Sequence, residues 1–144
     1  MSEILIDGDG GRISIVVERY EREFAENLDD ANWLSCNARA TIRSFFGASQ
    51  LAMTASELRR FRDSLAALVL NQSEMAQLDT MEENIRLRFR SHASGKVDID
   101  GAISEAGQRA VLNFRFLSDL PSLGQAVAAL DFATSQFPEI TTLS

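Results

Sequence analysis

Apolar and polar residues alternate along most of the chain with a period of two, which is typical of half-buried β-strands. The first two alternating runs, 3–7 and 12–20, flank Asp-Gly-Asp-Gly-Gly at 7–11. Glycine tolerates positive φ and aspartate hydrogen bonds to nearby backbone, so this pentapeptide predicts a turn between two strands.

A third and longer alternating run opens at Trp33. One side of it carries only apolar residues, namely Leu34, Cys36, Ala38, Ala40 and Ile42. This pattern predicts a strand with one buried face. We expect Phe45-Phe46-Gly47-Ala48 to turn the chain into a fourth strand over 49–53.

Two segments change to helical spacing. Thr54-Ala55-Ser56-Glu57 has the form of a capping box and predicts a helix that ends near Asn71. Asp119 predicts the N-cap of a closing helix that tolerates Pro121 in its first turn. Phe137-Pro138 ends that helix.

Four further strands are expected between the helices, at 76–81, 84–92, 96–104 and 109–117. Because short turns join them, neighbouring strands should pair antiparallel. We therefore predict an α+β fold with about eight strands, as one antiparallel sheet or split into two, covered by two helices. No linker or repeat of fixed period divides residues 1–144, so we expect one domain.

Composition restricts where such a domain works. The hydrophobic share is 45% and the charged share 24%, as in ordinary globular proteins. Cys36 is the sole cysteine, which excludes an internal disulfide and suits a reducing compartment. No apolar run approaches the roughly 20 residues of a membrane-spanning helix, and the N-terminus does not resemble a secretory signal. We expect a cytoplasmic protein that does not enter membranes.

The net charge narrows the class of partner. The chain carries 21 acids against 14 bases, a net charge of −7. Such a surface repels phosphate backbones, so we do not expect nucleic acid as a partner. It attracts a basic protein instead.

Groups able to do chemistry are few and scattered. The aspartates of the 7–11 turn resemble the start of a calcium loop, but the later ligands of that motif are missing. His92 is the only histidine, and Cys36 lies among apolar alternating positions. We therefore predict no catalytic residue, no metal site and no cofactor. An enzyme with a cavity between sheet and helix, using His92, Asp98 or Asp100, stays a third-ranked alternative.

Charged residues on the predicted strands have a structural explanation. A set of arginines could form a basic stripe on an exposed sheet face: Arg39, Arg43, Arg86, Arg88, Arg90 and Arg115. We expect these arginines to pair across strands with Asp98, Asp100 or other acids, on a solvated face.

The segment between the second and third strands combines acids with aromatic residues. A solvated loop explains most such runs. Aromatic residues surrounded by charge also suit a binding hot spot. The residues that we predict to contact a partner are Glu21, Glu23, Phe24, Glu26, Asp29, Asp30 and Trp33.

The order of several segments resembles the WapI-type immunity proteins, with which bacteria neutralise the toxic tail domain of their own contact-delivered toxins. The segments are Trp33-Leu34, the capped helix at 56–61, Ala76 to Glu82, Gly95 with its following strand, Leu112-Asn113-Phe114-Arg115-Phe116, and Ser118-Asp119. Leu120-Pro121-Ser122-Leu123 departs from the family, which has polar residues and an aromatic there. The resemblance transfers no binding residue.

The resemblance implies a small, cytoplasmic, cofactor-free inhibitor of a cognate toxin domain. We expect this chain to be a monomer or weak dimer. Many such toxins are nucleases with positive clefts, so an acidic inhibitor could associate quickly with a basic toxin. An acidic secretion chaperone is the alternative, although such chaperones usually begin with a helix and dimerise.

Overall fold

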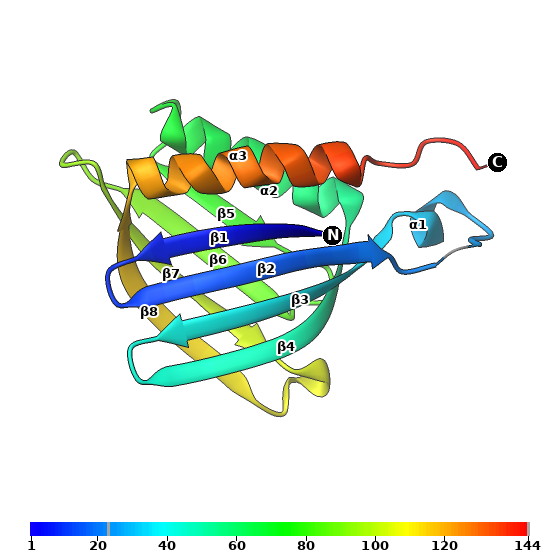
Figure 1. Ribbon diagram of the computed structural model, residues 1–144, viewed down its shortest axis with the longest axis horizontal. Helices are drawn as coiled ribbons and strands as arrows, with labels where there is room; N and C mark the ends of the chain where they lie inside the picture. The colour runs from blue at the N-terminus through cyan, green and yellow to red at the C-terminus, as the bar shows by residue number, and fades with distance from the viewer. Residues whose placement is uncertain (23, 144) are drawn as a thin grey trace.

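The structure is a computed structural model that describes residues 1–22 and 24–143, and it folds as two four-stranded antiparallel sheets (Figure 1). Sheet A contains, in spatial order, β1 (Ser2–Gly8), β2 (Gly11–Tyr20), β3 (Trp33–Ile42) and β4 (Phe45–Thr54). Sheet B contains β5 (Met75–Asp79), β6 (Ile85–Ser91), β7 (Lys96–Ser104) and β8 (Val111–Asp119). The helices are α1 (Leu28–Ala31), α2 (Ala55–Val69) and α3 (Leu120–Gln136), with a 3₁₀ turn η1 (Ala106–Gln108). The α+β prediction is confirmed, and the strands divide into two sheets.

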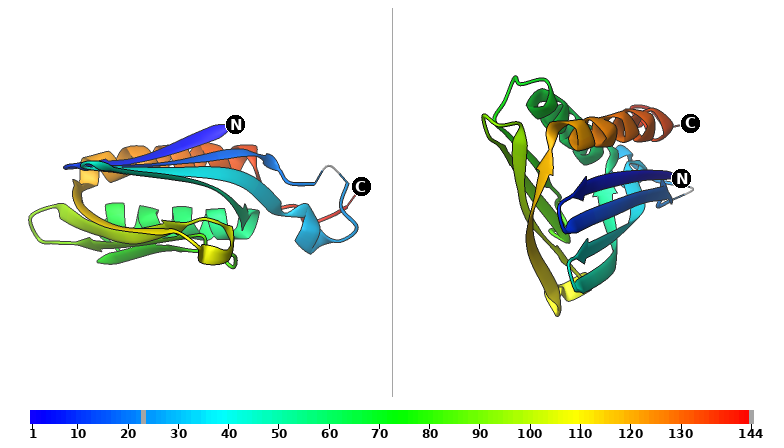
Figure 2. Two further views of the ribbon diagram at one scale, coloured as in Figure 1. Left: turned by 90° about the horizontal axis from the view of Figure 1, so that it is seen from below. Right: turned by 60° about the vertical axis from the view of Figure 1, so that its left-hand side comes forward.

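The two sheets form the walls of a wedge, and α2 and α3 lie side by side across its open side (Figure 2). Helix α3 packs along edge strand β1, and α2 packs along edge strand β5. The inner faces of the sheets and helices share one core, in which the Phe61 and Phe89 rings stack with centroids 6.0 Å apart. The alternation read from the sequence therefore places the apolar faces correctly.

Strand β8 crosses close to the β1–β2 turn because this turn has glycine at its ends. A Cβ atom at Gly11 would lie 2.4 Å from Cγ of Phe116, and one at Gly8 would lie 2.4 Å from the carbonyl oxygen of Leu117. In the same contact, the N–H of Asp9 donates to the carbonyl oxygen of Leu117 at 2.7 Å. The predicted turn is confirmed, and it also joins sheet A to sheet B.

The helix starts follow the sequence signals. Thr54 and Glu57 form the predicted capping box, with Glu57 N to Thr54 Oγ1 at 3.1 Å and Thr54 N to Glu57 Oε1 at 2.8 Å. The Asp119 carboxylate accepts from the N–H of Ser122 at 2.9 Å. This backbone hydrogen bond is the main reason why the pKa of Asp119 is lowered.

Two details of the prediction are wrong. Strand β4 begins at Phe45, so 45–48 is strand, and the turn is Arg43-Ser44 with Arg43 at φ +52°. This turn lacks the usual glycine, asparagine or aspartate, and the N–H of Arg43 is instead held by the carbonyl oxygen of Gly10 at 2.8 Å. The acidic segment, expected to be a loop, also contains the short helix α1.

Candidate functional site

The acidic segment between β2 and β3, residues 21–32 and here named the α1 loop, projects beyond the end of sheet A (Figures 1 and 2). Its two ends meet where the N–H of Glu21 donates to the carbonyl oxygen of Trp33 at 2.8 Å. Inside it, the Asn27 side chain caps α1 by accepting from the N–H of Asp30 at 2.9 Å. The α1 loop is therefore a closed protrusion with its own capped helical turn.

The C-terminal tail fastens this protrusion to the body. The Asn32 amide donates to the carbonyl oxygens of Leu28 (2.8 Å) and Ile140 (3.0 Å), and it accepts from the N–H of Ile140 at 2.7 Å. Tyr20 donates to the carbonyl oxygen of Pro138 at 2.5 Å and packs edge-on against Phe137. Partial burial raises the pKa of Tyr20. The backbone of the protrusion is thus held at both ends.

The predicted contact residues are not equally accessible. Glu21, Glu26 and Asp29 are exposed, and 88% of Phe24 is exposed. Asp30 is half-buried and lies 3.8 Å from Arg22.

Two other members of the predicted set stand apart. Trp33 is half-buried at the start of β3, where it pairs with Thr54 of β4. It is therefore part of sheet A and is less available to a partner than the exposed members of the set. Glu23 lies outside the described residues.

The residues considered for chemistry do not form a reactive cluster. His92 Nε2 lies 2.6 Å from Asp98 Oδ2, but both side chains are about half exposed. His92 lines a hollow of about 510 Å³ between the end of α2 and the β6–β7 turn, and Asp98 is not part of its lining. Cys36 lies in the core on sheet A, where burial raises its thiol pKa to about 12. An un-ionised thiol is a poor nucleophile.

Within residues 1–22 and 24–143, no three His, Cys, Asp or Glu side chains are grouped so that they could hold a metal ion. None of the described helices has the length and apolar character needed to cross a membrane.

The arginines do not form one stripe. Arg39 belongs to β3 and Arg43 to the turn after it, whereas Arg86, Arg88, Arg90 and Arg115 project from sheet B. Cross-strand pairing is confirmed for Arg88, but its partner is Asp79 at 2.7 Å, on β5. Asp100 stands opposite Arg88 and Arg115 in the strand register, while Asp98 pairs with His92.

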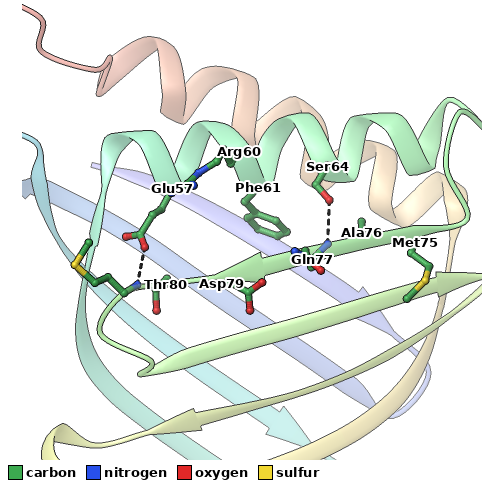
Figure 3. A pocket seen from close by; sticks show the side chains of 10 residues that line it. Glu57, Arg60, Phe61, Ser64, Met75, Ala76, Gln77, Asp79 and Thr80 are labelled. Carbon is green, nitrogen blue, oxygen red and sulfur yellow. Dashed lines mark hydrogen bonds between the residues drawn. The ribbon is translucent and has the colours of Figure 1, made fainter.

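A cavity of about 440 Å³ lies between α2 and β5, and its polar groups hold the fold together (Figure 3). Glu57 Oε2 accepts from the N–H of Met81 at 2.6 Å, and Ser64 Oγ accepts from the N–H of Gln77 at 3.0 Å. The capping-box signal identified Glu57 as a helix cap but carried no information about Met81. Two of the polar side chains that line the cavity, Glu57 and Ser64, are thus bonded to the backbone of β5 and of the turn after it.

Known structures share this fold at very low sequence identity. The plant transcriptional regulator PBF-2 aligns with a TM-score of 0.54 and 8% identity, over 94% of this chain and 81% of that one. WHY3 from Arabidopsis thaliana aligns with a TM-score of 0.52 and 9% identity, over 95% and 88%. At such identities the likeness concerns the fold alone.

A comparison with curated proteins finds no significant match. A family model, however, matches residues 4–138, nearly the whole chain. This range includes the three helices and both sheets, apart from the first two residues of β1. The chain belongs to the immunity protein WapI-like family.

Proposed function

We propose that this immunity protein binds the toxic C-terminal domain of a cognate bacterial toxin in the cytoplasm and that the α1 loop is a main contact. The observation that carries the proposal is Phe24, 88% exposed on a fastened, acidic protrusion. An aromatic side chain in water gains free energy when a partner covers it, and interface hot spots are enriched in aromatic residues. Because Glu21, helix α1 and Asn32 are already held by hydrogen bonds, the ordering entropy lost on binding is confined to the short stretch that carries Phe24.

The negative charge of the α1 loop and of the whole chain supports a toxin domain with a basic surface. The described part of the α1 loop carries Glu21, Glu26, Asp29 and Asp30 against Arg22 alone, in a chain of net charge −7. Opposite charges accelerate association and select the partner more than they add affinity. The same charge argues against nucleic acid as a ligand of this chain.

The test uses the C-terminal domain of the toxin encoded beside this chain's gene, in surface plasmon resonance at two salt concentrations. We expect a one-to-one complex. Phe24→Ala should raise the dissociation rate about tenfold, equivalent to about 1.4 kcal/mol. The triple variant E21Q/E26Q/D29N should lower the association rate about tenfold at low salt and flatten its salt dependence.

The control changes the net charge by the same amount elsewhere. The triple variant D63N/E74Q/D131N removes three exposed acids from α2, the segment after it and α3. Equal slowing by both triple variants would show that only overall charge matters and would remove the α1 loop from the interface. If the domain forms no complex at micromolar concentration, the proposal fails.

A further inference from the structure

Two of the four edge strands in this fold are covered by helices, and a third, β8, is bonded to another part of the chain near one end. Helix α3 lies along β1, and Ser64 of α2 accepts the outward N–H of Gln77 on β5. The β1–β2 turn bonds to β8 through Asp9 and Leu117. Edge strands left open invite pairing with another chain, so proteins commonly cover them. The fourth edge strand, β4, differs from these in the bonding of its backbone and in its sequence.

The direction of the β4 backbone groups follows from bonds at its end. The N–H of Thr54 points away from β3, to Glu57, whereas the N–H of the next residue, Ala55, points back to the carbonyl oxygen of Asn32. Antiparallel strands alternate these directions residue by residue. The even-numbered residues of β4 therefore direct both backbone groups to the open edge: Phe46, Ala48, Gln50 and Ala52.

The open groups have almost no partners in the described part of the chain. The only hydrogen bond found for them is the short-range one from Ser49 Oγ to the carbonyl oxygen of Gln50, at 3.1 Å. About four N–H groups and three carbonyl groups are left for water or for another strand.

The sequence of β4 also lacks the usual protection of an edge. Its ten residues, Phe-Phe-Gly-Ala-Ser-Gln-Leu-Ala-Met-Thr, include no charged residue and no proline. Each of the other three edge strands carries at least one charged residue. Charge, especially lysine, and proline are the means by which natural edges prevent pairing.

A groove of about 220 Å³, lined by both apolar and polar residues, runs beside this edge. Ala48 and the exposed ring of Phe46 (66% exposed) form one side, and Val111 (47% exposed) and Leu112 of β8 form the other. A strand added to β4 would place alternate side chains in this groove. Strand addition takes affinity from backbone bonds and specificity from such pockets.

The surroundings of the edge favour a basic partner over a second copy. Glu105 lines the groove, and β4 ends beside the α1 loop, where the N–H of Ala55 donates to the carbonyl oxygen of Asn32 at 2.9 Å. An incoming strand would thus meet carboxylates beside it and at one end. A second copy of this chain brings a net charge of −7 and is repelled.

We propose that the open edge of β4 receives an extended strand of the toxin domain. This strand is uncharged along its middle and basic at the end that reaches the α1 loop. The assignment rests on the proposed immunity function and specifies how the toxin is held.

Amide hydrogen exchange by NMR, with and without the neighbouring toxin domain, gives a distinct signature. We expect slowing of exchange by at least tenfold at Phe46, Ala48, Gln50 and Ala52. The odd-numbered amides of β4, already bonded to β3, should change far less. A side-chain contact without strand pairing would not produce this alternation.

A pair of variants at one position provides the second measurement. Gln50→Pro removes an outward N–H that serves no bond in the free sheet, and it should weaken toxin binding at least tenfold. Gln50→Val keeps the N–H and should stay within about threefold of the wild type. Circular dichroism checks that both variants fold, and if the proline variant does not, the exchange pattern decides.

Each outcome separates the two proposals. A tight complex without protection of the even-numbered amides overturns the strand assignment and leaves the immunity proposal standing. Absence of any complex overturns both. Protection that rises with protein concentration in the absence of toxin would identify a second copy as the occupant and overturn the toxin strand.

Discussion

Glu57 accepts the backbone N–H of Met81 at 2.6 Å while its other oxygen accepts the N–H of Thr54 at 2.8 Å. The Glu57 carboxylate, in a residue only 5% exposed, therefore joins the start of α2 to the turn that follows β5. The helix that covers the β5 edge is fixed at the point where the strand ends.

Replacing Glu57 should cost more than a usual helix cap. Glu57→Ala keeps the Thr54 cap but leaves the N–H groups of Thr54 and Met81 without their partner, and each loss should cost about 1–3 kcal/mol. Urea denaturation should show the loss, while Glu82→Ala, on the exposed turn beside it, should change stability by less than about 0.5 kcal/mol. Equal effects would mean that the bond to Met81 contributes nothing.

Two glycine substitutions should change the free energy of unfolding in opposite directions. Gly11→Ala places a methyl group 2.4 Å from the buried Phe116 ring and should destabilise the protein by about 1–3 kcal/mol. Gly124→Ala, within α3 and with only Val69 at 4.0 Å, should stabilise it by about 0.5–1 kcal/mol. Thermal unfolding of both variants checks the close crossing of β8. A neutral Gly11→Ala would contradict it.

Asn32 should control the order of the α1 loop. Asn32→Ala removes both donated bonds and the acceptor for Ile140, so we expect a loss of about 1–3 kcal/mol and faster proteolytic cutting within the loop. Asn32→Asp keeps the acceptor for the Ile140 N–H and should lie between the wild type and the alanine variant. Limited proteolysis followed by mass spectrometry locates the cuts. If the alanine variant and the wild type were cut within the α1 loop at the same rate, the C-terminal tail would not be holding the loop.

The thiol of Cys36 should make stability fall at high pH. Its pKa is about 12 in the fold against an ordinary 9.0, so below pH 9 the thiol is protonated in both states and its contribution is fully present. Between about pH 9 and 12 the unfolded chain loses this proton first, and the contribution disappears. Cys36→Ala should therefore lose less stability than the wild type over this window. At pH 8, native Cys36 should react with a thiol reagent at least about a hundredfold more slowly than in urea.

The sequence by itself determined the elements and most of their faces. Periods of two and 3.6 are local properties, so alternation from Leu34 to Ile42 and the capping box at Thr54 identified their strand and helix without tertiary information. The turn at Arg43-Ser44 could not be predicted from the local sequence because its conformation depends on Gly10, a residue distant in sequence. The acidic segment from Glu21 to Asp30 was also visible from the sequence.

Only the tertiary structure decided which of those residues are available and which edge stays open. Trp33 is drawn into β3, Phe24 stands in solvent, and Asn32 meets Ile140 across 108 positions of sequence. Such relationships depend on packing between distant segments. The absence of charged residues from β4 can be seen in the sequence alone. That this strand lies at an uncovered edge depends on the order of both sheets, which no local pattern encodes.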